Sequence, residues 1–161
     1  MKNVRRPLLR LALAATTLLS AACGPTFQAT APAGFVELED EPYDDYDFRA
    51  TSADGLVIAV RQIEHEPAGE SSFWVTAIKN RMRERGGYAF LEEVAVQSAD
   101  GVAGTQLRFG HDEASGKPHL YYLSVFVTPD FIYLMEAGGT KDLMTANEAK
   151  VQQAVASFRT R

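Results

Sequence analysis

The stretch that decides the fold is residues 101–137, GVAGTQLRFGHDEASGKPHLYYLSVFVTPDFIYLMEA. Apolar, β-branched and aromatic side chains dominate three runs within it, 102–109, 119–127 and 131–137. Turn-forming residues separate the runs, at 111–118 and at Pro129–Asp130. Runs bounded in this way are typical of strands, so the pattern predicts three consecutive strands.

A C-terminal helix is expected directly after these strands. Thr145 and Glu148 have the spacing of a capping box, in which each side chain satisfies a backbone donor of the first helical turn. Apolar residues then recur at helical spacing, so one face of the helix must pack on the sheet. The positions expected to be buried are Val151, Val155 and Phe158. Those expected to stay in solvent are Lys150, Gln152 and Arg159.

The chain before residue 101 adds further strands. A short strand is expected over 35–39. Asp54–Gly55 predicts a hairpin that joins strands at 46–50 and 56–63, because Asp followed by Gly favours a tight turn. The second of these strands is apolar on both faces, which indicates a strand that is covered on both sides. Asp100–Gly101 predicts a second hairpin.

A helix over 72–85 is expected between the two hairpins, with Ser71 or Ser72 as its N-cap and Gly86–Gly87 as its end. Its buried stripe would be Trp74, Val75, Ile78 and Met82. Four cations lie around the rest of it: Lys79, Arg81, Arg83 and Arg85. They could contact anionic lipid head groups or an acidic partner, or simply form a solvated face near the negative end of the helix dipole.

The first 22 of the 161 residues have the layout of a secretory signal. Four cations between Lys2 and Arg10 precede an apolar run at 8–19 and a small-residue end at 20–22. The run is too short to span a membrane as a helix. The remaining chain has the length of one domain, expected over 35–161.

Cys23 is the only cysteine and follows Leu18-Leu19-Ser20-Ala21-Ala22. This arrangement resembles the bacterial lipobox, which implies cleavage before Cys23 and a diacylglyceryl group on its sulfur. An ordinary secretory signal with a free thiol is the alternative. Ser20 stands where the lipobox favours leucine. Gly24, in place of Asp, resembles the signal for sorting to the outer membrane, with the domain facing the periplasm.

Cleavage would make the protein strongly acidic. Loss of four cations leaves 12 Lys and Arg against 21 Asp and Glu, a formal charge of −9. This charge disfavours nucleic acid as a partner, because phosphate contacts need a cationic surface. Residues 23–34 contain proline and alanine and little that could pack, so they are expected to form a lipidated tether.

Clustered carboxylates occur over 37–47. They could bind calcium, but the twelve-residue calcium-loop spacing is absent and Pro42 breaks the register, so a solvated loop is favoured. His65, His111 and His119 lack metal-ligand spacing, and His111 is expected in a hairpin loop. Residues 138–141 lack the glycine spacing of a phosphate loop and are expected to form the exit turn of a strand.

Arg108 and Glu136 lie within apolar strands, so each must be paired or face solvent at an edge. Aromatic residues of the same strands could line a ligand cleft or belong to the core, and the core is the commoner place for them. They are Tyr121, Tyr122, Phe126, Phe131 and Tyr133.

The order of elements gives an α+β fold, an α/β/α sandwich around a mainly antiparallel sheet. Together with the segment 101–109, the strands 120–127 and 131–137 and the ending 151–159, it resembles the Mog1/PsbP-like family. The resemblance implies a protein-binding or assembly-accessory module with no catalytic residue and no cofactor. The alternative is a lipoprotein that binds a small ligand or a metal in a cleft near the tyrosines, or an unrecognised hydrolase.

Overall fold

A computed structural model describes residues 26–39, 45–112 and 116–160 of the chain. Its strands are β1 (Phe27–Gln28), β2 (Phe35–Glu37), β3 (Phe48–Ser52), β4 (Val57–Glu64), β5 (Ala89–Gln97), β6 (Ala103–Asp112), β7 (Pro118–Val127), β8 (Phe131–Thr140) and β9 (Arg159–Thr160). Its helices are α1 (Ser71–Glu84), α2 (Lys141–Ala146) and α3 (Glu148–Ser157). No helix in these ranges is long and apolar enough to cross a membrane.

One seven-stranded sheet forms the middle layer, in the order β2-β3-β4-β8-β7-β6-β5. Every neighbouring pair is antiparallel. Strands β5 to β8 form a meander, and β8 returns to pair with β4, so α1 must cross one face of the sheet between β4 and β5. The predicted hairpins at Asp54–Gly55 and Asp100–Gly101 are confirmed, with both glycines at positive φ.

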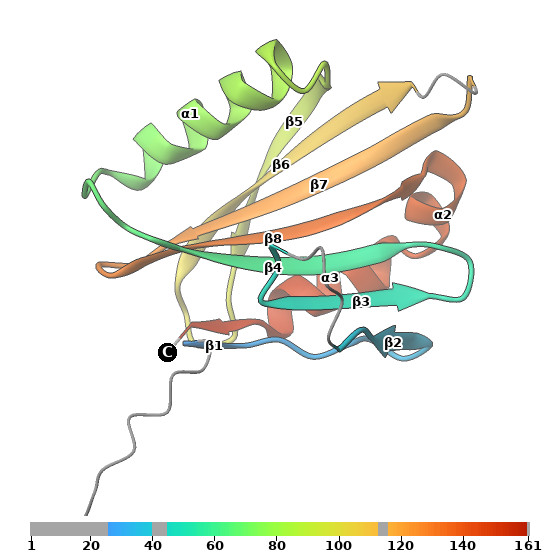
Figure 1. The fold of residues 1–161 in the computed structure, drawn as a ribbon, viewed down its shortest axis with the longest axis horizontal. Coiled ribbons are helices and arrows are strands. Elements are labelled where there is room, and N and C mark those ends of the chain that lie inside the picture. Colours follow the sequence, from blue (N-terminus) through green and yellow to red (C-terminus); the bar gives the residue numbers. More distant parts are fainter. Residues whose placement is uncertain (1–25, 40–44, 113–115, 161) are drawn as a thin grey trace, which may run out of the picture.

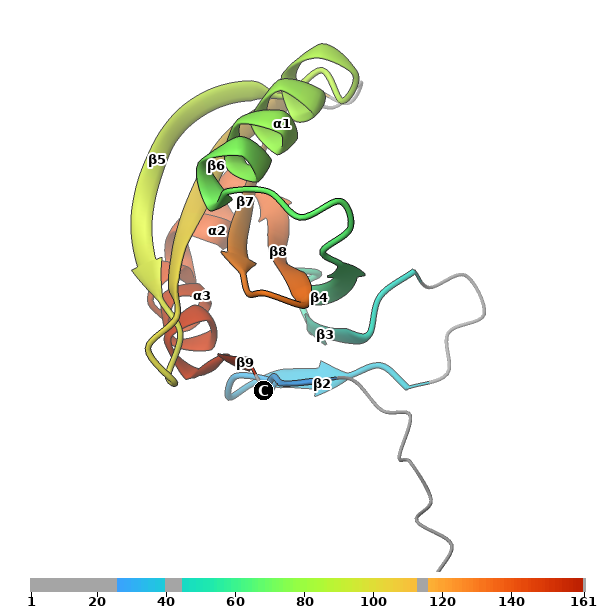
Figure 2. The same ribbon diagram turned by 90° about the vertical axis from the view of Figure 1, so that its left-hand side faces the viewer.

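The helices cover opposite faces of this sheet (Figures 1 and 2). Helix α1 packs through Val75 on a cluster that contains Leu107, Phe109, Leu123, Val125 and Ile132. Helices α2 and α3 pack on the other face, where Met144, Val151, Val155 and Phe158 join the larger cluster. The predicted α/β/α sandwich is therefore confirmed, as is the burial of Val151, Val155 and Phe158.

The segment expected as a tether is part of the fold where the structure describes it. Phe27 is only 5% exposed and packs in the larger cluster. Strand β1 pairs with β9, so the N-terminal segment lies beside the C-terminus (Figure 1). The sequence pattern missed this because one aromatic residue among small ones gives no periodic signal.

The C-terminal helical region differs from the predicted single helix. Thr145 lies inside α2, where its hydroxyl donates to the Lys141 carbonyl oxygen at 2.7 Å, so it caps nothing. Thr140 is the N-cap of α2 and accepts from the Leu143 amide. Helix α3 begins at Glu148 after Asn147, whose side chain makes no capping bond to α3. The predicted capping box is wrong, because the helix breaks at Asn147, between Thr145 and Glu148.

The central strands are longer than predicted. Strand β8 continues through residues 138–140, so the exit turn expected there is instead strand. Strands β6 and β7 extend until His111 lies directly opposite His119, so His111 is in a strand and not in the expected hairpin loop. Backbone pairing with neighbouring strands extends β6, β7 and β8 through polar and glycine residues that lie beyond the apolar runs from which the strands were predicted.

Candidate functional site

A groove runs between α1 and the sheet, over strands β4 and β8. It has a volume of about 510 Å³. Because α1 packs mainly over β5, β6 and β7, the adjoining face of β8 and β4 remains partly open. Its apolar lining includes Ile63, Trp74, Ile78, Met82, Leu123, Ile132 and Leu134. Its polar lining includes Arg61, Glu64, Glu66, Arg81, Tyr121 and Glu136.

Helix α1 forms one wall of this groove. Of the predicted stripe, Val75 is buried, whereas Trp74, Ile78 and Met82 are half-buried because they border the groove. The helix begins after Glu70, which makes no side-chain cap, so the expectation of a serine cap is wrong. Ser71 is instead the first helical residue.

The start of α1 is fixed by His65. The Trp74 indole nitrogen and the Gly69 amide both donate to His65 Nε2, each at 2.9 Å. His65 Nδ1 therefore carries the proton and donates to the Thr128 carbonyl oxygen at 2.7 Å. His65, for which no metal-ligand role was expected, thus links the β7–β8 turn, the loop at Gly69 and the start of α1 at one end of the groove.

Glu136 forms the polar base of the opposite end of the groove and is 8% exposed. Its Oε2 accepts from the hydroxyls of Tyr121, at 2.5 Å, and Tyr46, at 2.8 Å. Its Oε1 lies 3.4 Å from Arg61 Nη2. The expectation that Glu136 is paired is confirmed, and its carboxylate is compensated from three sides.

The tyrosines of this cluster are held in their protonated form. Burial, and then the adjacent Glu136 carboxylate, raise the pKa of Tyr121 well above its ordinary value. The same causes in the same order raise the pKa of Tyr46. The Arg61 guanidinium stacks over the Tyr46 ring at 4.4 Å. Arg61 Nε is buried without a hydrogen-bond partner.

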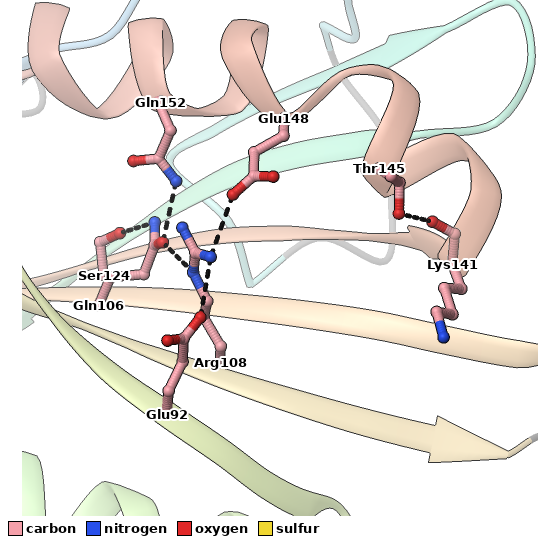
Figure 3. Close-up of polar contacts among 8 residues, drawn as sticks. All are labelled: Glu92, Gln106, Arg108, Ser124, Lys141, Thr145, Glu148 and Gln152. Atoms are coloured by element: carbon pink, nitrogen blue, oxygen red, sulfur yellow. Dashed lines mark hydrogen bonds and ion pairs between the residues drawn. The ribbon is translucent and has the colours of Figure 1, made fainter.

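A second polar cluster lies on the other face of the sheet, under α3 (Figure 3). Arg108 Nη1 lies 3.0 Å from carboxylate oxygens of both Glu92 and Glu148, so Arg108 is also paired, as expected. Gln106 Oε1 accepts from Arg108 Nε and from Gln152 Nε2. Gln152 was expected in solvent, but it is half-buried because it bonds to the sheet. This cluster links α3 to β6 and has a structural role.

The strand aromatics divide between the two faces, since alternate side chains of a strand point in opposite directions. Tyr121 lines the groove. Tyr122, Phe126 and Tyr133 belong to the larger core cluster, with Phe131 packed against it. The core interpretation therefore holds for four of the five, and Tyr121 is the one that reaches the candidate site.

The cations of α1 point in different directions. Lys79 Nζ lies 2.5 Å from the Glu93 carboxylate of β5, so Lys79 forms an ion pair within the protein. Arg81 lines the groove. Arg83 and Arg85 are exposed.

Among the described residues, no group of three His, Cys, Asp or Glu side chains could hold a metal ion. Cys23, residues 40–44 in the middle of the acidic segment 37–47 that could bind a cation, and the signal region lie outside the described residues.

The layers and strand order define an α/β/α domain of the Mog1/PsbP-like fold. The structure is similar to that of LpqN, described as involved in cell envelope biogenesis of Mycobacterium tuberculosis, with a TM-score of 0.69 and 13% identity over 87% of each chain. It is also similar to cyanobacterial PsbP, CyanoP, from Synechocystis, with a TM-score of 0.58 and 12% identity over 84% of this chain and 87% of that one.

A third similar structure comes from Bacteroides thetaiotaomicron, with a TM-score of 0.53 and 14% identity over 84% of this chain and 45% of that one. No protein-family model matches the sequence, and no curated protein matches it. At these identities the likeness establishes the fold, so function has to be argued from the groove.

Proposed function

We propose that this protein is a non-enzymatic, membrane-anchored lipoprotein of the cell envelope that acts as a protein-binding or assembly-accessory module. The observation that carries the proposal is the apolar groove between α1 and strands β4 and β8. The fold shared with LpqN, a protein of cell envelope biogenesis, supports the compartment.

The anchor in this proposal is Cys23. Residues 1–22 act as the signal peptide, and lipid on Cys23 holds the protein at the outer membrane, facing the periplasm. The support comes from the lone cysteine at the end of a basic, apolar and small-residue sequence.

A protein segment suits the groove better than a reactive substrate does. Although Arg61 Nε has no hydrogen-bond partner among the described residues, the carboxylate and the tyrosine hydroxyls at the base of the groove already satisfy one another, since Glu136 accepts two tyrosine hydrogen bonds and an arginine contact. They therefore offer no free base or nucleophile. The rest of the groove is an apolar strip bordered by exposed Ile63 with Glu64 and Glu66 at one end and by the Arg81 guanidinium at the other. Apolar side chains beside a carboxylate would complement both features.

A small ligand remains the second candidate, because one observation favours it. Tyr121, Glu136 and Arg61 converge at the same end of an apolar groove, which is the usual composition of a ligand pocket. Such a ligand would have to present a hydrogen-bonding group to this cluster. Because no metal-binding group occurs in the described ranges, the metal part of this alternative is not carried further.

The test is site-specific photocrosslinking in the native envelope. A photoreactive amino acid replaces Arg81, which lines the groove, or Arg83, an exposed neighbour on the same helix that does not line it. We expect a discrete protein adduct from position 81 alone. Ile63→Asp, at a 43% exposed groove position, should abolish the adduct without unfolding the domain. Equal adducts from both positions would contradict the proposal, and an adduct of small-molecule mass at position 81 would favour the second candidate.

A further inference from the structure

The chain is fixed to the fold almost immediately after the proposed anchor. The Thr26 amide and hydroxyl both donate to Gln62 Oε1 at 2.9 Å. The next residue, Phe27, is buried. Three residues of even fully extended chain span about 10 Å, so lipid on Cys23 would hold this part of the domain at the bilayer surface.

Thr26 lies at one identifiable end of the sandwich. Its partner Gln62 is near the end of β4 and lies opposite Tyr133 near the start of β8. The His65 amide donates to Asp130 in the β7–β8 turn, and the Trp74 indole binds His65, so the start of α1 belongs to the same end. Figure 2 looks onto this end, which we name the anchor-proximal face.

Two large apolar side chains are exposed on this face. Phe73, in the first turn of α1, is 60% exposed, and Ile63, at the end of β4, is 43% exposed. Phe73 packs edge-on against Trp74, with ring centroids 5.3 Å apart, and this contact fixes the position of its ring. Exposed apolar residues at the same end of the sandwich as a lipid attachment point are what a bilayer interface would cover.

The charge of the anchor-proximal face determines which lipid head groups it can contact. Its exposed carboxylates include Glu64, Glu66, Glu70, Asp130 and Asp47, which accepts from the Gln62 amide, and they outnumber the exposed cation Arg159 beside β1. They would be repelled by anionic head groups, so the face fits an electroneutral lipid surface and a shallow contact.

We propose that the anchor-proximal face rests on the bilayer, with Phe73 and Ile63 at the boundary between head groups and acyl chains. This inference depends on the lipidation of Cys23 proposed above. It also orients the groove: Trp74 and Ile63 line its membrane end, whereas Arg81 and Glu136 lie at the end that points away from the bilayer. A ligand or partner segment could then enter the groove directly from the membrane surface.

The test uses the full lipidated protein in phosphatidylcholine vesicles, with a polarity-sensitive fluorophore on a single introduced thiol. Phe73→Cys places the probe on the anchor-proximal face. Leu91→Cys is the matched control, since Leu91 is 54% exposed but lies near the start of β5, at the opposite end of the sheet from the anchor-proximal face. We expect the Phe73 probe to emit at shorter wavelength and to be quenched by nitroxide lipids, and the Leu91 probe to behave as in water. Replacing part of the lipid by phosphatidylglycerol should weaken the quenching.

The outcomes separate the two proposals. Labelling of the parent protein, whose only thiol is Cys23, would show that Cys23 is not lipidated, and would overturn the anchor and with it the orientation. A vesicle-bound protein whose Phe73 probe remains in water, or whose two probes are quenched equally, would overturn the orientation alone. A Phe73 probe that is shielded in native membranes but not in pure lipid would also overturn it, and would assign this face to a protein.

Discussion

The hydroxyl oxygens of Thr26 and Tyr133 lie 2.8 Å apart, although 107 positions separate the two residues in the chain. Tyr133 is fully buried in the middle of the larger core cluster. The N-terminal segment is thereby attached to β8, at the centre of the sheet, and contributes to the stability of the domain.

Phe27→Ala should destabilise the protein strongly. The Phe27 ring contacts Tyr133 and Phe158 at centroid distances of 6.0 and 5.7 Å. Removing a buried phenylalanine costs about 3–5 kcal/mol, because it loses apolar burial and leaves a cavity. The measurement is the urea midpoint of the mature chain. Gln28→Ala, at an exposed position of the same strand, is the control and should change stability by less than about 0.5 kcal/mol. Equal midpoints would show that β1 is not docked.

Phe158→Ala should have a similar effect for the C-terminal region. Phe158 is fully buried and stacks on Phe126 at 5.3 Å, so its loss should cost about 3–5 kcal/mol. Gln153→Ala is the control, because Gln153 is exposed. Gln152→Ala should fall between the two, at about 0.5–1.5 kcal/mol, since it removes the hydrogen bond to Gln106. Urea unfolding that ranks the three variants differently would contradict the docking described here.

Gly104→Ala should destabilise the sheet through a close approach. Gly104 lies opposite Phe126, and a Cβ at residue 104 would be 2.6 Å from the Phe126 ring and 2.8 Å from the Val125 carbonyl oxygen. Overpacking of this kind typically costs about 1–3 kcal/mol. Gly110→Ala, six residues along the same strand, would place its Cβ 3.9 Å from Leu91 and should be tolerated. Thermal unfolding of both variants checks the difference, and equal melting temperatures would refute it.

The main architecture could be predicted from the sequence because local patterns specify its strands, hairpins and C-terminal helix. Alternating and continuous apolar runs indicate the central strands, and Asp-Gly pairs mark both hairpins. The periodicity of 151–158 indicates the helix that covers one face. Each of these signals depends on near neighbours in the chain, so the fold class followed from them.

The candidate site could not be predicted, because it depends on distant pairings. Glu136 was recognised as needing a partner, but Tyr46 is 90 positions away and Arg61 lies on another strand. The groove itself exists because α1 leaves β8 and β4 partly uncovered, and no local pattern reports where a helix lies across a sheet. The helix break at Asn147 was missed for the opposite reason: a plausible local capping pattern competed with the one that tertiary packing selected.

Cys23→Ala should release the protein from membranes. A lipid anchor on Cys23 supplies the acyl chains, and the variant can carry none. Fractionation followed by mass spectrometry of the N-terminal peptide checks both the location and the lipid mass. Phe73→Ser is the companion variant, since it removes the apolar contact but keeps the anchor, and should remain in the membrane fraction. A Cys23→Ala variant that sediments as fully as the parent would contradict the lipoprotein proposal.

The Glu136 cluster should make the domain sensitive to alkali. The pKa of Tyr121 is raised in the folded state, from an ordinary value of 10.0, by burial and then by Glu136. The folded protein therefore keeps this proton at a pH where the unfolded chain loses it. The resulting stabilisation is fully present below pH 10 and is lost as the pH rises, by about 1.4 kcal/mol for each further unit per tyrosine. Urea unfolding between pH 8 and pH 11 should show this decline. In Tyr121→Phe the slope of the unfolding free energy against pH should be smaller by the contribution of about one proton, even if the variant is less stable at pH 8. An identical decline in parent and variant would mean that the folded protein does not retain the Tyr121 proton above pH 10.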